Sequence, residues 1–115
     1  MVPETYRIAF AALHAVWEER PCESLAVLLG SMRINPNDDI SMDPACLEDW
    51  QQVLHQANDA AELDLILAYL DFDLSLYKPQ PEDMQRLVVA LRAEGSRERA
   101  IVDSVIENWN HPLHG

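Results

Sequence analysis

The chain has 115 residues, which is the size of about one domain. Apolar residues make up 49% and charged residues 24%, a composition typical of a folded protein and too apolar for a disordered one. Its 20 acidic and 8 basic residues give a formal net charge of −12, which argues against direct binding to nucleic acid because contacts to phosphates depend on Lys and Arg. We expect one helical domain over residues 1–115, with 110–115 as a flexible tail.

A first helix is expected between Pro3 and Pro21, because apolar side chains recur there at spacings of four, three and four residues. These side chains are Tyr6, Phe10, Leu13 and Trp17. A second helix is predicted from about residue 23 to 31. Residues 33–42 are dense in turn formers and are expected to form a loop.

The third helix has the clearest start in the sequence. Asp43 is a good N-cap residue, and Pro44 suits the first helical position, where its missing N–H costs nothing. A fourth helix is predicted over residues 60–76, with an apolar surface wide enough for the centre of a bundle. Its end, residues 69–77, also alternates apolar and polar side chains, so a short strand remains an alternative there.

A fifth helix is predicted from Pro81 to Gly95, and Ser96 is expected to cap a sixth. The connections are short, which favours antiparallel packing of neighbouring helices. The fold class expected is therefore all-α, a single-domain bundle of five to six short antiparallel helices. All three tryptophans lie in phase with apolar stripes and are expected in the core. They are Trp17, Trp50 and Trp109.

Charge is distributed unevenly along the chain. Between Ile34 and Tyr77 there is no Lys or Arg, and this segment holds ten acidic residues, whereas the rest has ten acidic against eight basic residues. Such a segment is either a solvated face that keeps the protein soluble or a surface that attracts a basic partner. The candidate partner-binding residues are Asp38, Asp39, Asp43, Glu48, Asp49, Asp59, Glu62, Asp71 and Asp73.

Aromatic residues accompany the last of these acids. Tyr69, Phe72 and Tyr77 flank Asp71 and Asp73. If exposed, such aromatic side chains within a polar rim would form a binding hot spot.

The sequence does not have the residue spacings that metal-binding and catalytic motifs require. A calcium-binding loop that starts at Asn35 or Asn37 puts Ile40 or Met42 at the sixth position, where a glycine is required. The four histidines and two cysteines lack the spacings of zinc sites, and no flanking residues typical of a catalytic serine or cysteine occur. We expect no metal, no cofactor, no catalytic residues and no enzymatic activity.

The N-terminal residues do not resemble an export signal, and the two cysteines are expected to be reduced thiols. The longest apolar stretch, residues 63–76, is interrupted by Asp64, Asp71 and Asp73 and is not expected to span a membrane. We therefore expect a cytoplasmic protein without membrane association. The sequence does not indicate whether the chain forms oligomers.

Two segments carry a resemblance to known proteins. Residues 28–32 read LLG-x-M, and residues 43–50, after a polar loop, read DPA-x-x-x-DW. This arrangement is similar to immunity-type proteins of bacterial contact-dependent growth inhibition and related polymorphic toxin systems. The resemblance implies a non-enzymatic protein that binds and neutralises a cognate basic toxin domain, often a nuclease. A generic acidic interaction or regulatory module, and a small ligand-binding or enzymatic bundle, remain alternatives.

Overall fold

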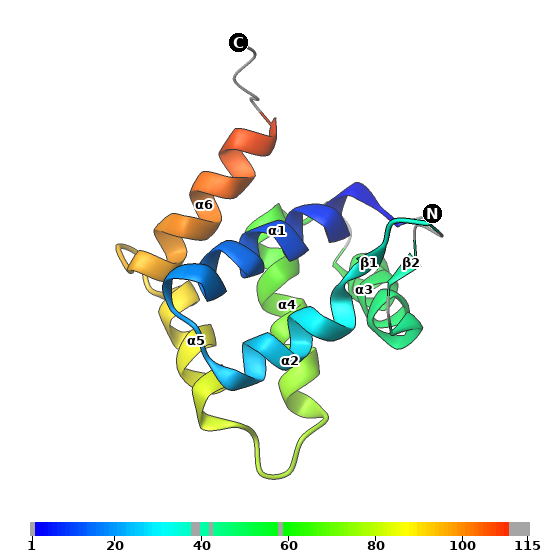
Figure 1. Ribbon diagram of the computed structural model, residues 1–115. Helices are drawn as coiled ribbons and strands as arrows, with labels where there is room; N and C mark the ends of the chain where they lie inside the picture. Colours follow the sequence, from blue (N-terminus) through cyan, green and yellow to red (C-terminus); the bar gives the residue numbers. More distant parts are fainter. Residues whose placement is uncertain (1, 38–39, 42, 58, 111–115) are drawn as a thin grey trace.

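The computed structural model describes residues 2–37, 40–41, 43–57 and 59–110, and these residues form six helices and one short pair of strands (Figure 1). The elements are α1 (Glu4–Glu19), α2 (Glu23–Met32), β1 (Ile34–Asn35), β2 (Ile40–Ser41), α3 (Pro44–Gln56), α4 (Glu62–Ser75), α5 (Glu82–Arg92) and α6 (Arg97–Asn110). The all-α bundle expected from the sequence is confirmed. The flexible tail was expected over residues 110–115, but Asn110 is the last residue of α6, and residues 111–115 lie outside the described residues.

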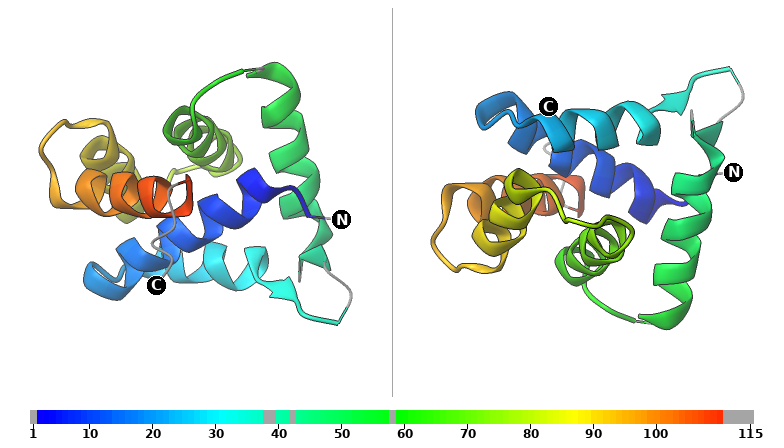
Figure 2. Two further views of the ribbon diagram at one scale, coloured as in Figure 1. Left: turned by 90° about the horizontal axis from the view of Figure 1, so that it is seen from above. Right: turned by 90° about the horizontal axis from the view of Figure 1, so that it is seen from below.

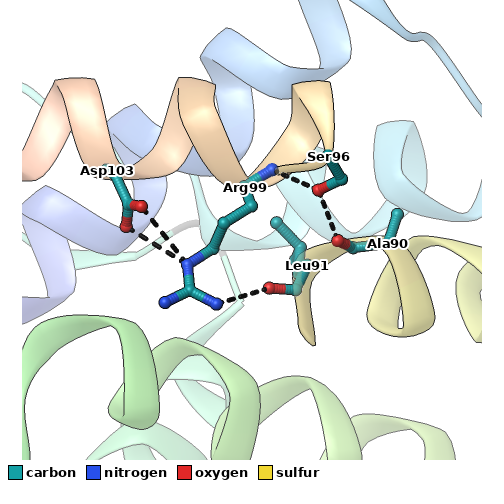
Figure 3. Close-up of polar contacts among 5 residues, drawn as sticks. All are labelled: Ala90, Leu91, Ser96, Arg99 and Asp103. Atoms are coloured by element: carbon teal, nitrogen blue, oxygen red, sulfur yellow. Dashed lines mark hydrogen bonds and ion pairs between the residues drawn. The ribbon is translucent and has the colours of Figure 1, made fainter. Parts of the chain in front are cut away.

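Two helix starts follow from local sequence. The Asp43 carboxylate accepts a hydrogen bond from the Ala45 N–H at 3.0 Å, with Pro44 in the first turn of α3, as the sequence predicts. At the start of α6 the Ser96 hydroxyl oxygen accepts a hydrogen bond from the Arg99 N–H at 3.0 Å (Figure 3). Gly95, just before it, has a φ of 86°, a conformation that favours glycine.

The serine cap also ties α6 back to α5. The Ser96 hydroxyl donates to the Ala90 carbonyl, and the Arg99 guanidinium extends toward the Leu91 carbonyl and Asp103 (Figure 3). Arg99 therefore bridges the end of one helix and the first turns of the next. Arg99, which belongs to the basic residues of the C-terminal part of the chain, thus has a structural role.

The sequence-based reading of the segment 33–42 as a loop is incomplete. Ile34 pairs with Ser41, and Asn35 pairs with Ile40, in a minimal antiparallel arrangement. Two-residue strands are too short to produce a period-2 pattern of apolar and polar residues, so they could not be predicted from the sequence. At residues 69–77 the chain is helical to Ser75, so the strand alternative does not hold.

The helices pack around α1 and α4. α1 contacts α2, α4 and α6, and its contact with α6 brings the two ends of the described chain together. α3 lies across the N-terminal end of α1 and the C-terminal end of α2, as both views of Figure 2 show. α2 also contacts α3 and α5, and α4 contacts the same two helices. The helices α2, α3, α4 and α5 therefore follow one another in a closed ring of contacts.

Aromatic rings from three helices form the centre of the core. The Trp50 ring on α3 meets Tyr6 on α1 and Tyr69 on α4 edge to face, with centroids 6.0 and 5.3 Å apart. Its indole N–H donates to the Thr5 hydroxyl at 3.0 Å, and the Tyr6 hydroxyl donates to the Met32 carbonyl at 2.8 Å. These contacts join α1, α2, α3 and α4, and they give the Trp50 indole N–H and the Tyr6 hydroxyl hydrogen-bond partners inside the core.

Only one of the three tryptophans lies fully in the core as predicted. Trp50 is completely buried, Trp17 is half-buried, and Trp109 is 37% exposed. The Trp109 indole N–H donates to Glu4 at 2.9 Å at the edge of the α1–α6 contact. Helical phase identifies the inner face of a helix, but it does not reveal whether a neighbouring element covers a given turn.

Candidate functional site

A groove of about 410 Å³ opens between α2, α3, the end of α4 and the start of α5. We call it the acidic groove. Its floor consists of buried side chains from three helices, namely Leu28, Cys46 and Met84. Its edges carry Val27, Leu76 and Tyr77, which are 64%, 60% and 46% exposed. Large exposed apolar side chains around a concavity are typical of a binding site.

The walls of the groove carry negative charge. The acidic residues that line it are Glu23, Asp43, Asp49 and Asp73. None of the described residues that line the groove is Lys or Arg. The groove therefore combines an apolar floor with carboxylates and holds no positive charge of its own.

Two of these carboxylates face the groove from different helices. Burial raises the pKa of Asp73 on α4, and the negative charge of Asp49 on α3 raises it further. Burial likewise raises the pKa of Asp49, with added repulsion from Glu48 and Asp43. The Asp73 charge also raises the pKa of Tyr77, and both residues line the groove. These groups thus repel one another in a partly dehydrated setting.

The cysteine in the groove floor is not a reactive thiolate. Burial raises the pKa of Cys46, an effect that exceeds the opposing hydrogen bond with the Tyr69 side chain. Burial also raises the pKa of Cys22. Both cysteines are free thiols, as expected from the sequence. A thiol that is held protonated is a poor nucleophile at neutral pH, so Cys46 acts as part of the apolar floor.

Three of the nine candidate acidic residues line the groove, namely Asp43, Asp49 and Asp73. A fourth, Glu48, does not line it but precedes Asp49 on α3 and repels its charge. Asp71 lies only two residues from Asp73, yet it forms an ion pair with Arg92 of α5. Asp38 and Asp39 lie outside the described residues. The remaining two, Asp59 and Glu62, lie at the other end of α4, which is on the order of 15–20 Å from Asp73 by helical rise.

Glu62 sits in a second acidic setting that does not belong to the groove. Burial raises the pKa of its carboxyl, and the charge of Glu4 raises it further. Its buried Oε2 atom has no hydrogen-bond partner among the described residues. The base-free segment of the sequence therefore divides into two separate acidic regions in space.

The acidic groove is also lined by residues that the sequence analysis did not single out. Val27 and Glu23 come from α2, which the candidate list omitted altogether. A signal for Val27 was present, because it lies out of phase with the buried face of its own helix. Of the three aromatic residues considered as hot-spot candidates, Tyr77 lies on the groove edge, Tyr69 is buried and Phe72 is half-buried.

A second, smaller groove of about 270 Å³ lies between α1 and α2 and has a different character. Along one side of α1, the His14 ring stacks on Phe10 and meets Trp17 at a tilt, with ring centroids 6.0 and 5.9 Å apart. Arg33 also lines this groove, and the His14 side chain lies 3.0 Å from the Glu18 carboxylate. This groove lacks the carboxylate lining of the first, so it does not share the attraction for cations.

The comparisons with known proteins do not identify the site, and a search for metal-binding geometry does not identify it either. No protein-family model matches the chain, and neither a curated protein nor a solved structure matches it. Within the part of the chain that the structure describes, no group of three or more His, Cys, Asp or Glu side chains is arranged to hold a metal ion. None of the described helices combines the length and apolar character needed to cross a membrane.

Proposed function

We propose that this chain binds a basic protein through the acidic groove and the carboxylates around it, and that it neutralises a toxin domain in this way. The observation that carries the proposal is the convergence of Asp49 and Asp73, from different helices, on a groove edged by exposed apolar side chains. The resemblance of residues 28–50 to immunity-type proteins supplies the class of partner.

The physical basis is electrostatic complementarity together with an apolar anchor. The mutual repulsion of Glu48 with Asp49, and of Asp49 with Asp73, is relieved when a cationic surface approaches. Charge of one sign concentrated at a cleft also accelerates encounter with an oppositely charged partner. The exposed edge residues Val27 and Leu76 supply apolar area for an interface whose rim is polar.

A toxin with a nucleic-acid substrate is a suitable target. Its substrate site carries Lys and Arg for contact with phosphates, and a carboxylate-rich surface competes for the same groups. Covering that site blocks the substrate, so no catalytic machinery is required in the inhibitor.

Co-purification from the native host at low and high salt tests the proposal. We expect recovery of a basic toxin-like protein at low salt. The double charge reversal Glu48→Lys with Asp49→Lys should lower its affinity at least tenfold, and the loss should shrink at high salt. A matched control is Glu94→Lys with Glu107→Lys, which changes net charge equally at exposed positions away from the groove. Equal affinity of the groove variant and the control variant would contradict the proposal.

The alternative is a generic acidic interaction or regulatory module, which the same groove also supports. Expression of the recovered partner separates the two. A toxin-neutralising protein should restore growth of cells that express the partner, and the double charge reversal should abolish the rescue. A partner that is harmless on its own would favour the generic module.

A further inference from the structure

The acidic groove places apolar and anionic groups within one helical turn of each other on both walls. On α3, Cys46 and Asp49 are three residues apart and both line the groove. On α4, Asp73 lies in the last turn, and Leu76, which also lines the groove, follows three residues later. Residues three apart on a helix share one face about one turn from each other. Each wall therefore offers a methyl or thiol group beside a carboxylate.

This pairing matches a long aliphatic chain that ends in a positive charge. Lys and Arg side chains bury their methylene stems on apolar surface and keep the charged head in a polar setting. The groove floor, with Leu28 and Met84, provides the apolar surface. Asp49 on α3 and Asp73 on α4 both line the groove and provide hydrogen-bond acceptors from two different helices. A bare metal ion fits the site less well, because it would leave the apolar edges without a partner.

The volume also exceeds what one side chain needs. About 410 Å³ falls within the range of binding pockets, and the edges carry three large exposed apolar side chains. A cationic residue that enters the groove can therefore bring an apolar neighbour onto Val27 or Leu76. Arginine suits two separate carboxylates better than lysine does, since its planar guanidinium carries five donors that can bridge them.

We propose that the acidic groove is the anchor site for one arginine side chain of the partner protein, with the stem on Leu28 and Met84 and the guanidinium between Asp49 and Asp73, and with an adjacent apolar residue of the partner on the groove edge. This inference rests on the proposed function for the presence of a basic partner. The groove chemistry itself can be measured without that partner.

The probe is a blocked tripeptide, Leu-Arg-Leu, titrated into the whole chain while the Met84 methyl resonance is followed by NMR. The comparison peptide carries citrulline at the centre, which keeps the shape of arginine and removes its charge. We expect the arginine peptide to shift the Met84 resonance and to bind at least tenfold more tightly than the citrulline peptide. Equal affinities, or shifts that leave the Met84 methyl unmoved, would overturn the proposal.

Isosteric variants test the two carboxylates. Asp49→Asn and Asp73→Asn should each weaken binding of the arginine peptide at least fivefold, and together they should abolish the preference over citrulline. Asp64→Asn is the matched control, because Asp64 is an exposed carboxylate on the same helix as Asp73 and does not line the groove. An equal loss in the Asp64→Asn variant would refute the site.

Titration with a free diamine, pentane-1,5-diamine, distinguishes a site for a cationic side chain of a protein from a site for a small cationic molecule. Binding of the diamine as tightly as the arginine peptide would contradict a protein anchor. Failure of the inference is distinguishable from failure of the proposed function. If the peptide does not bind but charge reversal still weakens binding of the partner, the carboxylates act as a flat surface and only the anchor site is refuted. If the peptide binds but no basic partner exists, only the proposed function is refuted.

Discussion

The Asp83 carboxylate at the start of α5 accepts two hydrogen bonds from Ser24 at the start of α2, from the backbone N–H at 2.9 Å and from the hydroxyl at 2.6 Å. It also accepts the Met84 N–H at 2.8 Å. A residue 59 positions away thus caps α2, whose own N-cap residue, Cys22, makes no side-chain cap. Because Ser24 and Met84 both line the acidic groove, this cap sets the position of one wall relative to the floor.

Removal of this cap should destabilise the fold. We expect Asp83→Ala to lower the free energy of unfolding by about 1–2 kcal/mol at neutral pH, the scale of a lost helix cap with a second hydrogen bond. The hydrogen bonds from Ser24 lower the pKa of Asp83. Its stabilising effect is therefore present above the ordinary Asp range and is lost as pH falls through the lowered value.

Urea unfolding over a range of pH measures this effect. Ser24→Ala, which removes the hydroxyl and keeps the backbone N–H, should cost less than Asp83→Ala. In the double variant the two losses should not add, because both remove the same contact. Additive losses would show that the two residues act independently.

Neutralisation of Asp73 should have the opposite effect on stability. Burial and Asp49 raise the pKa of Asp73, so ionisation of this group is unfavourable in the folded chain. We expect Asp73→Asn to raise the free energy of unfolding at neutral pH by a few tenths to about 1 kcal/mol. The gain should shrink as pH falls through the raised pKa of Asp73 toward the ordinary Asp range, because the wild-type carboxyl becomes protonated there.

Urea titrations of the wild type and the Asp73→Asn variant at neutral and mildly acidic pH provide the measurement. Asp64→Asn is again the control, and its effect on stability should be smaller. A loss of stability in the Asp73→Asn variant at neutral pH would mean that the carboxylate has a stabilising partner.

The Tyr6 hydroxyl should contribute measurably to the core. Tyr6→Phe removes the donor to the buried Met32 carbonyl and leaves that carbonyl without its partner. We expect the free energy of unfolding to fall by about 1–2 kcal/mol with little change in ring packing. Tyr69→Phe is the matched comparison, because Tyr69 is equally buried but hydrogen-bonds to the Cys46 thiol, a weak partner. Thermal unfolding should rank the Tyr6 variant as the less stable of the two.

The ion pair between Arg97 and Glu19 should contribute little to the free energy of unfolding. The guanidinium makes two contacts of 2.8 Å with the carboxylate and links α6 to α1, but both side chains are about half exposed. We expect Glu19→Gln to cost less than about 1 kcal/mol, and the cost should fall further in high salt. Denaturation at low and high ionic strength tests this. A loss that is independent of salt would indicate that packing of the side chain, and not its charge, is responsible.

Local features were readable from the sequence because the chemistry that fixes them lies within a few residues. Asp43 with Pro44, and Ser96 at the start of α6, satisfy backbone groups of their own helix turns, so the structure confirms them as predicted. The cap on α2 was not readable, since its donor and acceptor are 59 residues apart. The short strand pair was missed because two-residue strands have no measurable period.

The sequence by itself determined that this is an acidic, all-α chain with its charge concentrated between residues 34 and 77. It could not determine which carboxylates share a face, because that depends on helix rotation and packing. Asp71 and Asp73 are neighbours in sequence, yet successive helical residues turn by about 100°, so they lie on nearly opposite sides of α4. Asp71 meets Arg92, and Asp73 enters the groove beside Asp49. Only the tertiary structure, which packs α3 against α4 and α2 against α3 and α5, brought two distant acids and the apolar edge into one groove.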